Sequence, residues 1–370
     1  MPADCRRFSN FNSQQKIPNK MIKKVLFSHF PFVIIFILSC GGEKFRLPEQ
    51  PEGTDGTAAV SDTTYIQLNP IWEPPTHDFN QPKDILLGRE PLIYIADTGN
   101  DRILMLDLAG NILGERKIEN PVALAQDTRL RLLVVSDSNK IFRIDLVAAN
   151  HNLANAIVDT VFEEVDNPDR KYTGIAGFVR VGQQGQPIFG YYVTATGRET
   201  RDNQVLVFPD DFDVRVPDAV NLEPNGLGIL SASEPSGVTT LGDFSIDFIF
   251  CMVGQNSFKV QWITGGEFGF TTRISPANGG LDIFEPGKFT SPEDVTIDNE
   301  GSIYVIDAQR DFLFKFTATG DELQSFGESG SGEKQFNQPH GVAVFNKTLY
   351  VADTGNNRIV RFRLSTDIGQ

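Results

Sequence analysis

Short runs of alternating apolar and polar residues, separated by glycine, asparagine and proline, follow one another from about residue 65 onward. Alternation with a period of two predicts half-buried β-strands, and a Gly/Asn turn between two such runs predicts a hairpin. Two hairpin-like segments, residues 93–103 (IYIADTGNDRI) and 349–359 (LYVADTGNNRI), have nearly the same sequence. We therefore expect an all-β chain that is built from repeated hairpin units.

A shorter strand precedes each hairpin, and in most units it opens with a proline. Aligned on this feature, the sequence contains six units, which start at Pro82, Pro121, Thr173, Pro224, Pro292 and Pro339. Successive starts are 39, 52, 51, 68 and 47 residues apart. A period of roughly 40 to 50 residues is typical of a four-stranded propeller blade with insertions in its loops. Because the third and fourth units are degenerate, five blades with one long insertion remain an alternative to six.

These units resemble NHL repeats. The similarity rests on the Pro-x-Gly-Val-Ala-Val start at 339–344, the core at 350–359 and the connecting segment at 326–333. It is strongest in the first, fifth and sixth units and extends over about residues 65–365. The resemblance implies a six-bladed β-propeller. The strand-like segment 64–68 is then expected to supply the outer strand that the last blade lacks, which closes the ring and removes its free edges.

The N-terminal region has the pattern of a secretory leader. A basic start, MIKK at 21–24, precedes a short apolar run at 25–39, and the Leu-Ser-Cys at 38–40 resembles the lipobox of bacterial lipoproteins. We expect Cys40 to become the lipid-modified first residue of the mature protein, with palmitate as one acyl chain. Several acyl chains on one residue give stable membrane anchoring. Cleavage elsewhere and an uncleaved anchor are the alternatives.

The expected organisation follows from these patterns. Glycine, proline and charged residues with little to bury indicate a flexible tether between the lipid and the propeller. The expected segments are 1–20 as an overcalled start, 21–39 as the lipoprotein signal peptide, 40–64 as the tether and 65–370 as the NHL-type propeller. This organisation places the protein at a bacterial cell envelope, with its globular part in an aqueous compartment.

The chain is acidic, with 48 Asp and Glu against 33 Lys and Arg, for a formal net charge of -15. Removal of residues 1–39 takes away six basic residues and one acidic residue, which changes the net charge to -20. A polyanion is repelled by nucleic acid and by anionic lipid surfaces, so neither is an expected partner. With Cys40 acylated, Cys251 has no disulfide partner, and it is expected to lie in the core.

Candidate chemistry gathers just after the start of each unit, where the innermost strand of a blade begins at the mouth of the central channel. The candidate ligand-binding residues are Lys83, Asp84, Asn225, Glu293, Asp294 and His340. The resemblance implies that such carboxylates, with the amide oxygen of Asn225, could hold a calcium-like cation, as in related propeller lactonases and esterases. The fixed Glu/Asn/Asp set of those families has no alignable counterpart in this sequence, and only His340 matches the channel histidines of NHL-like zinc lyases. We therefore expect no metal and no other cofactor.

Four aspartates recur just before the turn of a unit: Asp97, Asp137, Asp307 and Asp353. Their repetition indicates a structural role, in which each carboxylate accepts hydrogen bonds from turn N–H groups. The sequence has no Gly-x-Ser-x-Gly elbow, P-loop or dinucleotide fingerprint in a supporting context. It therefore favours a binding or scaffolding module, whose partner is an unknown protein or a small envelope ligand. The alternative is a propeller hydrolase, lactonase or lyase with a metal in its channel.

Overall fold

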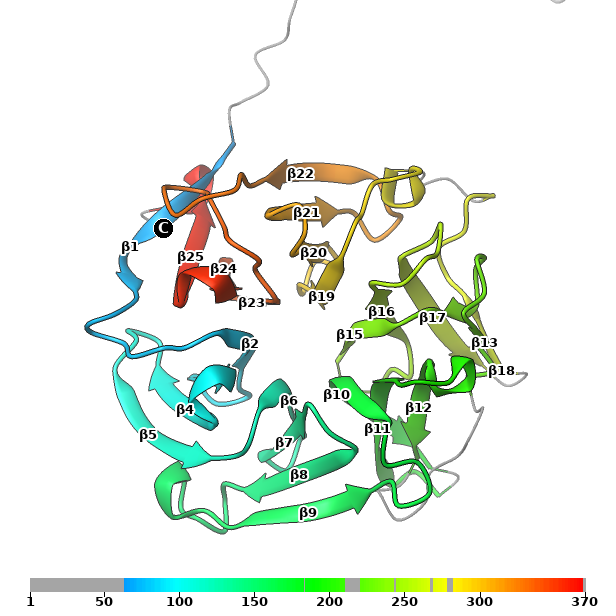
Figure 1. Ribbon diagram of the computed structural model, residues 1–370, viewed down its shortest axis with the longest axis horizontal. Coiled ribbons are helices and arrows are strands. Elements are labelled where there is room, and N and C mark those ends of the chain that lie inside the picture. The colour runs from blue at the N-terminus through cyan, green and yellow to red at the C-terminus, as the bar shows by residue number, and fades with distance from the viewer. Residues whose placement is uncertain are drawn as a thin grey trace, which may run out of the picture. The chain divides into compact units, whose positions relative to one another are not determined.

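A ring of six β-sheet blades surrounds a central channel in the computed structural model of the chain (Figure 1). It describes residues 63–182, 184–209, 220–242, 244–266, 269–277 and 282–368. The leader, Cys40 and most of the tether lie outside this part of the chain. Among the described residues, helix is confined to 3-10 turns of three residues, and none is long and apolar enough to cross a membrane.

Neighbouring strands of each blade are antiparallel, and the innermost strand lines the channel (Figure 1). Blade 1 holds β2 (Pro82–Leu87), β3 (Leu92–Asp97), β4 (Arg102–Asp107) and β5 (Ile112–Lys117). Blade 2 holds β6 (Pro121–Gln126), β7 (Arg131–Ser136), β8 (Lys140–Asp145) and β9 (Val158–Glu163). Blade 3 holds β10 (Lys171–Val181), β11 (Pro187–Thr196) and β12 (Gln204–Phe208) within the described residues.

The later blades follow the same plan. Blade 4 holds β15 (Pro235–Thr240), β16 (Phe248–Met252), β17 (Val260–Gly266) and β18 (Gly269–Thr272). Blade 5 holds β19 (Pro292–Ile297), β20 (Ile303–Asp307), β21 (Phe312–Phe316) and β22 (Glu322–Phe326). Blade 6 holds β23 (Gly341–Phe345), β24 (Thr348–Asp353), β25 (Arg358–Leu364) and β1 (Tyr65–Trp72). A short parallel pair, β13 (Glu223–Pro224) and β14 (Ser231–Ala232), precedes blade 4.

The N-terminal strand closes the ring, as the sequence predicted. β1 pairs with β25 in antiparallel register, with Tyr65 opposite Leu364 and Leu68 opposite Arg361. The Tyr65 hydroxyl also donates to the Tyr304 hydroxyl of blade 5 at 3.3 Å. Since strands from both ends of the domain share one sheet, the outer edge of β25 is paired.

Six apolar clusters fill the six interfaces between consecutive blades. The cluster between blades 6 and 1, for example, packs Ile95 and Leu104 of blade 1 against Tyr350 and Ile359 of blade 6. Each blade therefore buries both faces against its neighbours, which a single open stack of small sheets does not achieve. Six interfaces require six blades, and the alternative of five blades is excluded.

A buried aspartate fixes the turn of the last blade. The Asp353 side chain is 0% exposed, and its Oδ1 accepts a hydrogen bond from the Asn337 backbone N–H at 2.7 Å. Its Oδ2 accepts from Asn356 Nδ2 at 2.9 Å and from Arg358 Nε at 2.7 Å. Asp97 makes the same three kinds of contact in blade 1. The structural role expected for these two aspartates is confirmed, but the expected partners are not. Neither carboxylate accepts a backbone N–H group of the turn that follows it. The backbone N–H that each accepts lies in the loop before the innermost strand of its blade.

The other two aspartates of the predicted set differ from each other. Asp307 is also buried and accepts from the backbone N–H groups of Thr290 and Ser291. Asp137 does not belong to the set, because Ser136 is the residue that pairs with the strand-opening Pro121. Asp137 is one position further along, half exposed, and forms an ion pair of 2.8 Å with Lys171. The prediction of a structural acceptor at Asp137 is wrong by one residue.

Candidate functional site at the channel mouth

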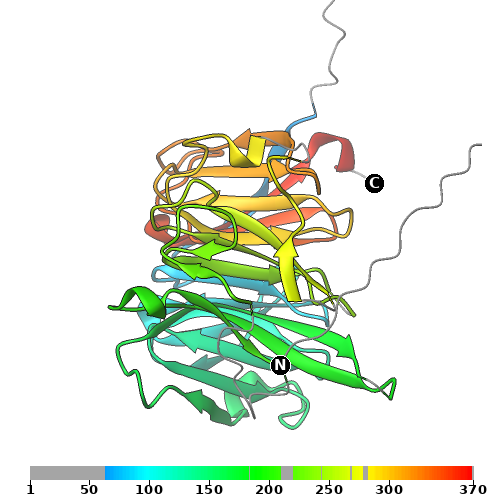
Figure 2. The ribbon, with the colours of Figure 1, turned by 90° about the vertical axis from the view of Figure 1, so that its right-hand side faces the viewer.

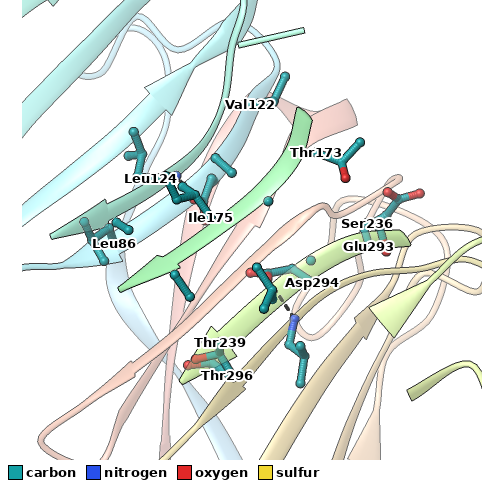
Figure 3. Close-up of a pocket in the computed structure, with 18 of the residues that line it drawn as sticks. Leu86, Val122, Leu124, Thr173, Ile175, Ser236, Thr239, Glu293, Asp294 and Thr296 are labelled. Atoms are coloured by element: carbon teal, nitrogen blue, oxygen red, sulfur yellow. Dashed lines mark hydrogen bonds between the residues drawn. The ribbon is translucent and has the colours of Figure 1, made fainter. Parts of the chain in front are cut away.

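A cavity of about 410 Å³ occupies the channel between the innermost strands of all six blades (Figure 3). In the side view the strands run roughly along the channel axis (Figure 2). The start and the end of each innermost strand therefore lie at opposite openings of the channel. The opening where these strands start is called the mouth below. Thr173, Ser236 and Glu293 lie at this end of the lining (Figure 3).

The innermost strands carry a β-bulge near the mouth, seen as a register shift after Pro82, Pro121 and Pro292 and at matching places in β10 and β15. A bulge redirects the following side chain, and the residues at this position around the ring are Asp84, Ala123, Gly174, Gly237, Asp294 and Gly341. Glycine is needed where blades approach closely. A Cβ on Gly341 would lie 2.7 Å from the Lys83 carbonyl oxygen and 2.8 Å from the Asp84 Cα.

Asp84 and Asp294, the two aspartates at the bulge position, each form a hydrogen bond to the next blade. Asp84 accepts from its own neighbour, the Ile85 N–H, and from the Leu124 N–H of blade 2, each at 2.7 Å. Burial raises the pKa of Asp84 to about 6 despite these two hydrogen bonds. Each carboxylate oxygen of Asp84 thus already accepts a hydrogen bond from a backbone N–H group.

Asp294 of blade 5 forms the same two kinds of hydrogen bond, one to its own neighbour in the chain and one to blade 6. Its Oδ1 accepts from the Val295 N–H at 2.8 Å, and its Oδ2 accepts from the Val342 N–H of blade 6 at 2.9 Å. Burial, followed by the negative charge of Asp84, raises the pKa of Asp294. The two carboxylates therefore oppose each other's ionisation within one cavity.

Three further predicted residues, Lys83, Glu293 and His340, line the cavity at the mouth. His340 Nδ1 lies 3.6 Å from Glu293 Oε2, and the Ser291 hydroxyl donates to Glu293 Oε1 at 3.0 Å. Burial, with the Lys83 charge second, lowers the pKa of His340 to about 4, so its imidazole is neutral at pH 7. Burial raises the pKa of Glu293. The mouth thus offers an ammonium donor, a carboxylate acceptor and an imidazole that can do either.

The prediction for Asn225 is corrected by the structure. Asn225 follows β13 and is not part of the cavity lining, and its Oδ1 accepts a hydrogen bond from Asn203 Nδ2 at 2.8 Å. Blade 4 starts at Pro235 rather than Pro224, so Ser236 takes the position at the mouth. The sequence did contain the signal, because Pro-Ser-Gly-Val at 235–238 matches the Pro-His-Gly-Val that opens the last unit.

The calcium-like site that the resemblance implied does not fit these residues. Among the described residues, no group of three or more His, Cys, Asp or Glu side chains is arranged to hold a metal ion. Asn225 lies outside the cavity, and the Asp84 and Asp294 oxygens already accept backbone N–H groups.

Comparison with known proteins agrees with the architecture. Residues 336–362 match the NHL repeat family. Human "NHL repeat-containing protein 3" is 32% identical over 123 residues, an alignment that covers 28% of this chain and 35%, about a third, of that protein.

Two solved structures share the fold at low identity. An auxiliary nutrient binding protein from Bacteroides ovatus superposes with a TM-score of 0.55 at 10% identity, covering 82% of this chain and 78% of that one. A gluconolactonase from Xanthomonas campestris gives 0.51 at 11% identity, covering 82% and 91%. At these identities the likeness concerns the fold alone. With six blades around one channel, the chain is a β-propeller that carries an NHL repeat in its last blade.

Proposed function

We propose that this protein is a binding module of the bacterial cell envelope, anchored by lipid on Cys40, which takes its ligand at the channel mouth. The convergence of Lys83, Glu293 and His340 on one cavity carries the proposal. The residue types at these three positions differ from blade to blade. The carboxylates of the repeated Asp97 and Asp353, by contrast, already accept hydrogen bonds from an arginine of their own blade. Variable residues on a rigid scaffold are the usual composition of a binding surface.

The size and chemistry of the mouth restrict the ligand. A cavity of about 410 Å³ lies within the range of small-molecule sites, and a protein segment can also enter it from the mouth. Lys83 suits an acceptor on the ligand, Glu293 suits a donor, and the neutral His340 suits either. The nutrient-binding propeller from Bacteroides ovatus offers a precedent on the same fold.

The test is capture of a partner by tagged full-length protein from an envelope extract, followed by a direct affinity measurement. Replacement of Glu293 and His340 together by alanine should weaken binding and leave the unfolding midpoint nearly unchanged. A matched control replaces Lys140 and Glu163, an exposed ion pair on blade 2, and should bind normally. Equal affinity of both double variants would show that the mouth is not the recognition site.

The anchor has its own test. Cys40→Ser should release the protein from membranes or leave an unprocessed precursor, as judged by fractionation and gel mobility. A Cys40→Ser protein that remains membrane-bound at the mature size would rule out Cys40 as the lipid site. This outcome would leave the proposal for the channel mouth standing.

A propeller hydrolase, lactonase or lyase is the second candidate. It is favoured by two carboxylates of raised pKa, Asp84 and Asp294, in one cavity, since such groups concentrate at catalytic sites. The gluconolactonase from Xanthomonas campestris has the same fold. Elemental analysis of the protein, purified without chelators, separates the candidates. Calcium or zinc held at one ion per chain supports the enzyme, and a metal-free protein that still binds its captured partner supports the binding module.

A further inference from the structure

A second pocket, of about 320 Å³, lies on the face of the ring opposite the mouth, between blades 6 and 1. Its polar lining includes Arg361, Arg363 and Tyr350, and its apolar lining includes Leu68, Leu108 and Phe345. None of its residues lines the channel cavity. The pocket is therefore a separate site.

Strand geometry places the two arginines side by side. Arg361 and Arg363 are alternate residues of β25, so their side chains leave the same face of the sheet, about 7 Å apart along the strand. They pair across to Tyr350 and Thr348 of β24, while β1 covers the other edge of β25 (Figure 1). Two positive charges are thus directed to one place by the backbone.

Within the part of the chain that the structure describes, neither guanidinium is paired with a carboxylate. Arg361 Nη2 donates to the Pro70 carbonyl at 2.8 Å, and Arg363 Nη2 donates to the Asn346 carbonyl at 3.1 Å. The Nε atoms of both are buried without a hydrogen-bond partner, and neither arginine has an ion pair with a carboxylate among the described residues. The carboxylate of Asp367 is paired with Lys347 at 2.8 Å. In a chain of net charge -15, two adjacent arginines without a carboxylate are conspicuous.

Arg361 is also held in place before any ligand arrives. Its Cζ lies 4.4 Å from the centre of the buried Trp72 ring, and the centroids of the Trp72 and Tyr350 rings are 6.1 Å apart. Burial lowers the pKa of Arg361, as expected for a charge that lacks compensation. A stacked guanidinium loses little further freedom when it binds an anion.

The chain supplies its own comparison. On blade 4, Arg273 lies 4.6 Å over the Trp262 ring, and there Asp247 approaches the guanidinium at 3.6 Å. The same arginine-on-tryptophan arrangement is therefore completed by a carboxylate at one site and left without one at the other. The pocket borders Arg361, the arginine that lacks a carboxylate among the described residues.

We propose that this pocket binds a small organic acid, with its carboxylate on Arg361 and Arg363 and its apolar part against Leu68, Leu108 and Phe345. Arginine is suited to planar carboxylates through paired N–H donors. The volume of about 320 Å³ accommodates an acid of a few carbon atoms. This site is independent of the channel mouth and of the ligand that the mouth takes.

Calorimetric titration of the full chain with hexanoate, acetate and hexanol at matched ionic strength tests both halves of the site. Hexanoate should bind saturably, and acetate and hexanol should each bind about tenfold or more weakly, because each lacks one of the two contacts. Equal affinity for hexanoate and acetate, or no saturable binding of hexanoate, would overturn the proposal.

Substitutions complete the test. Arg363→Gln should weaken hexanoate binding about tenfold or more, since charge-assisted hydrogen bonds are lost. Arg361→Gln should do the same, but it also removes a contact with Trp72, so Arg363→Gln is the variant that decides if Arg361→Gln fails to fold. Arg273→Gln, the matched arginine on Trp262, should leave the affinity within about twofold. Hexanoate affinity that is the same in Arg363→Gln and in the unsubstituted protein would contradict the site.

Discussion

The buried aspartate of the last blade gives the sharpest test of how the ring is held together. Asp353→Ala removes the acceptor of three hydrogen bonds and leaves Arg358, which is 3% exposed, without its carboxylate. Breaking a buried ion pair costs about 3 to 5 kcal/mol. Because Arg358 keeps its bonds to the Ser331 and Gln335 carbonyls, we expect the lower end, about 3 kcal/mol, or about a hundredfold in the unfolding equilibrium.

Urea unfolding followed by tryptophan fluorescence measures this loss. Asp137→Ala is the matched control, because Asp137 forms an exposed ion pair with Lys171, and such pairs contribute about 0 to 1 kcal/mol. The variant should therefore unfold almost like the unsubstituted protein. If Asp353→Ala and Asp137→Ala lose the same free energy of unfolding, burial of the carboxylate does not determine its contribution, and the reasoning is refuted.

Three other outcomes follow from the fold. Gly110→Ala should lower the free energy of unfolding by about 1 to 3 kcal/mol, because Gly110 has a φ of +93° and a Cβ would lie 2.4 Å from the Trp72 ring; an unchanged urea midpoint would contradict this. Deletion of residues 65–68 should destabilise the whole ring, since β1 is the outer strand of blade 6, and an unaltered melting temperature would argue against closure by this strand. Between pH 4 and 6, Asp84→Asn should make stability rise more steeply with pH and His340→Gln less steeply. The reason is that the raised pKa of Asp84, about 6, makes its ionisation cost stability as the pH rises, whereas the lowered pKa of His340, about 4, makes its protonation cost stability as the pH falls. Parallel pH profiles of urea midpoints in all three proteins would refute both assignments.

Repetition made the ring predictable from sequence. The matching hairpins at 93–103 and 349–359 fixed the unit, and the strand-like segment 64–68 could be assigned to the last blade because that unit lacked one strand. Repetition failed where an insertion offered two starts. Pro224 and Pro235 are both followed by a glycine two residues later, and the pairing of Pro235 with Met252 identifies Pro235 as the true start.

Site residues could be predicted from the sequence where their position depends on a local motif, and not where it depends on contacts between blades. Lys83, Glu293 and His340 follow the opening prolines, so the unit alignment brought them to one cavity. The roles of Asp84 and Asp294 depend on N–H groups of the next blade, which no local pattern specifies. The arginine pocket combines β25 with Leu108 and Trp72 of other segments, and sequence periodicity describes only one of its walls.

Pairing of β1 with β25 also determines when the protein can finish folding. The Thr64 backbone N–H donates to the Ser365 hydroxyl across 301 residues. The first strand of the domain to be synthesised, β1, therefore cannot pair until the last strand, β25, has been synthesised. Contacts of such separation form late, because the loop between them must close first. Until then the apolar faces of blades 1, 5 and 6 that meet at the closure stay in water. A nascent chain is thus most prone to aggregate in the interval before β25 pairs with β1.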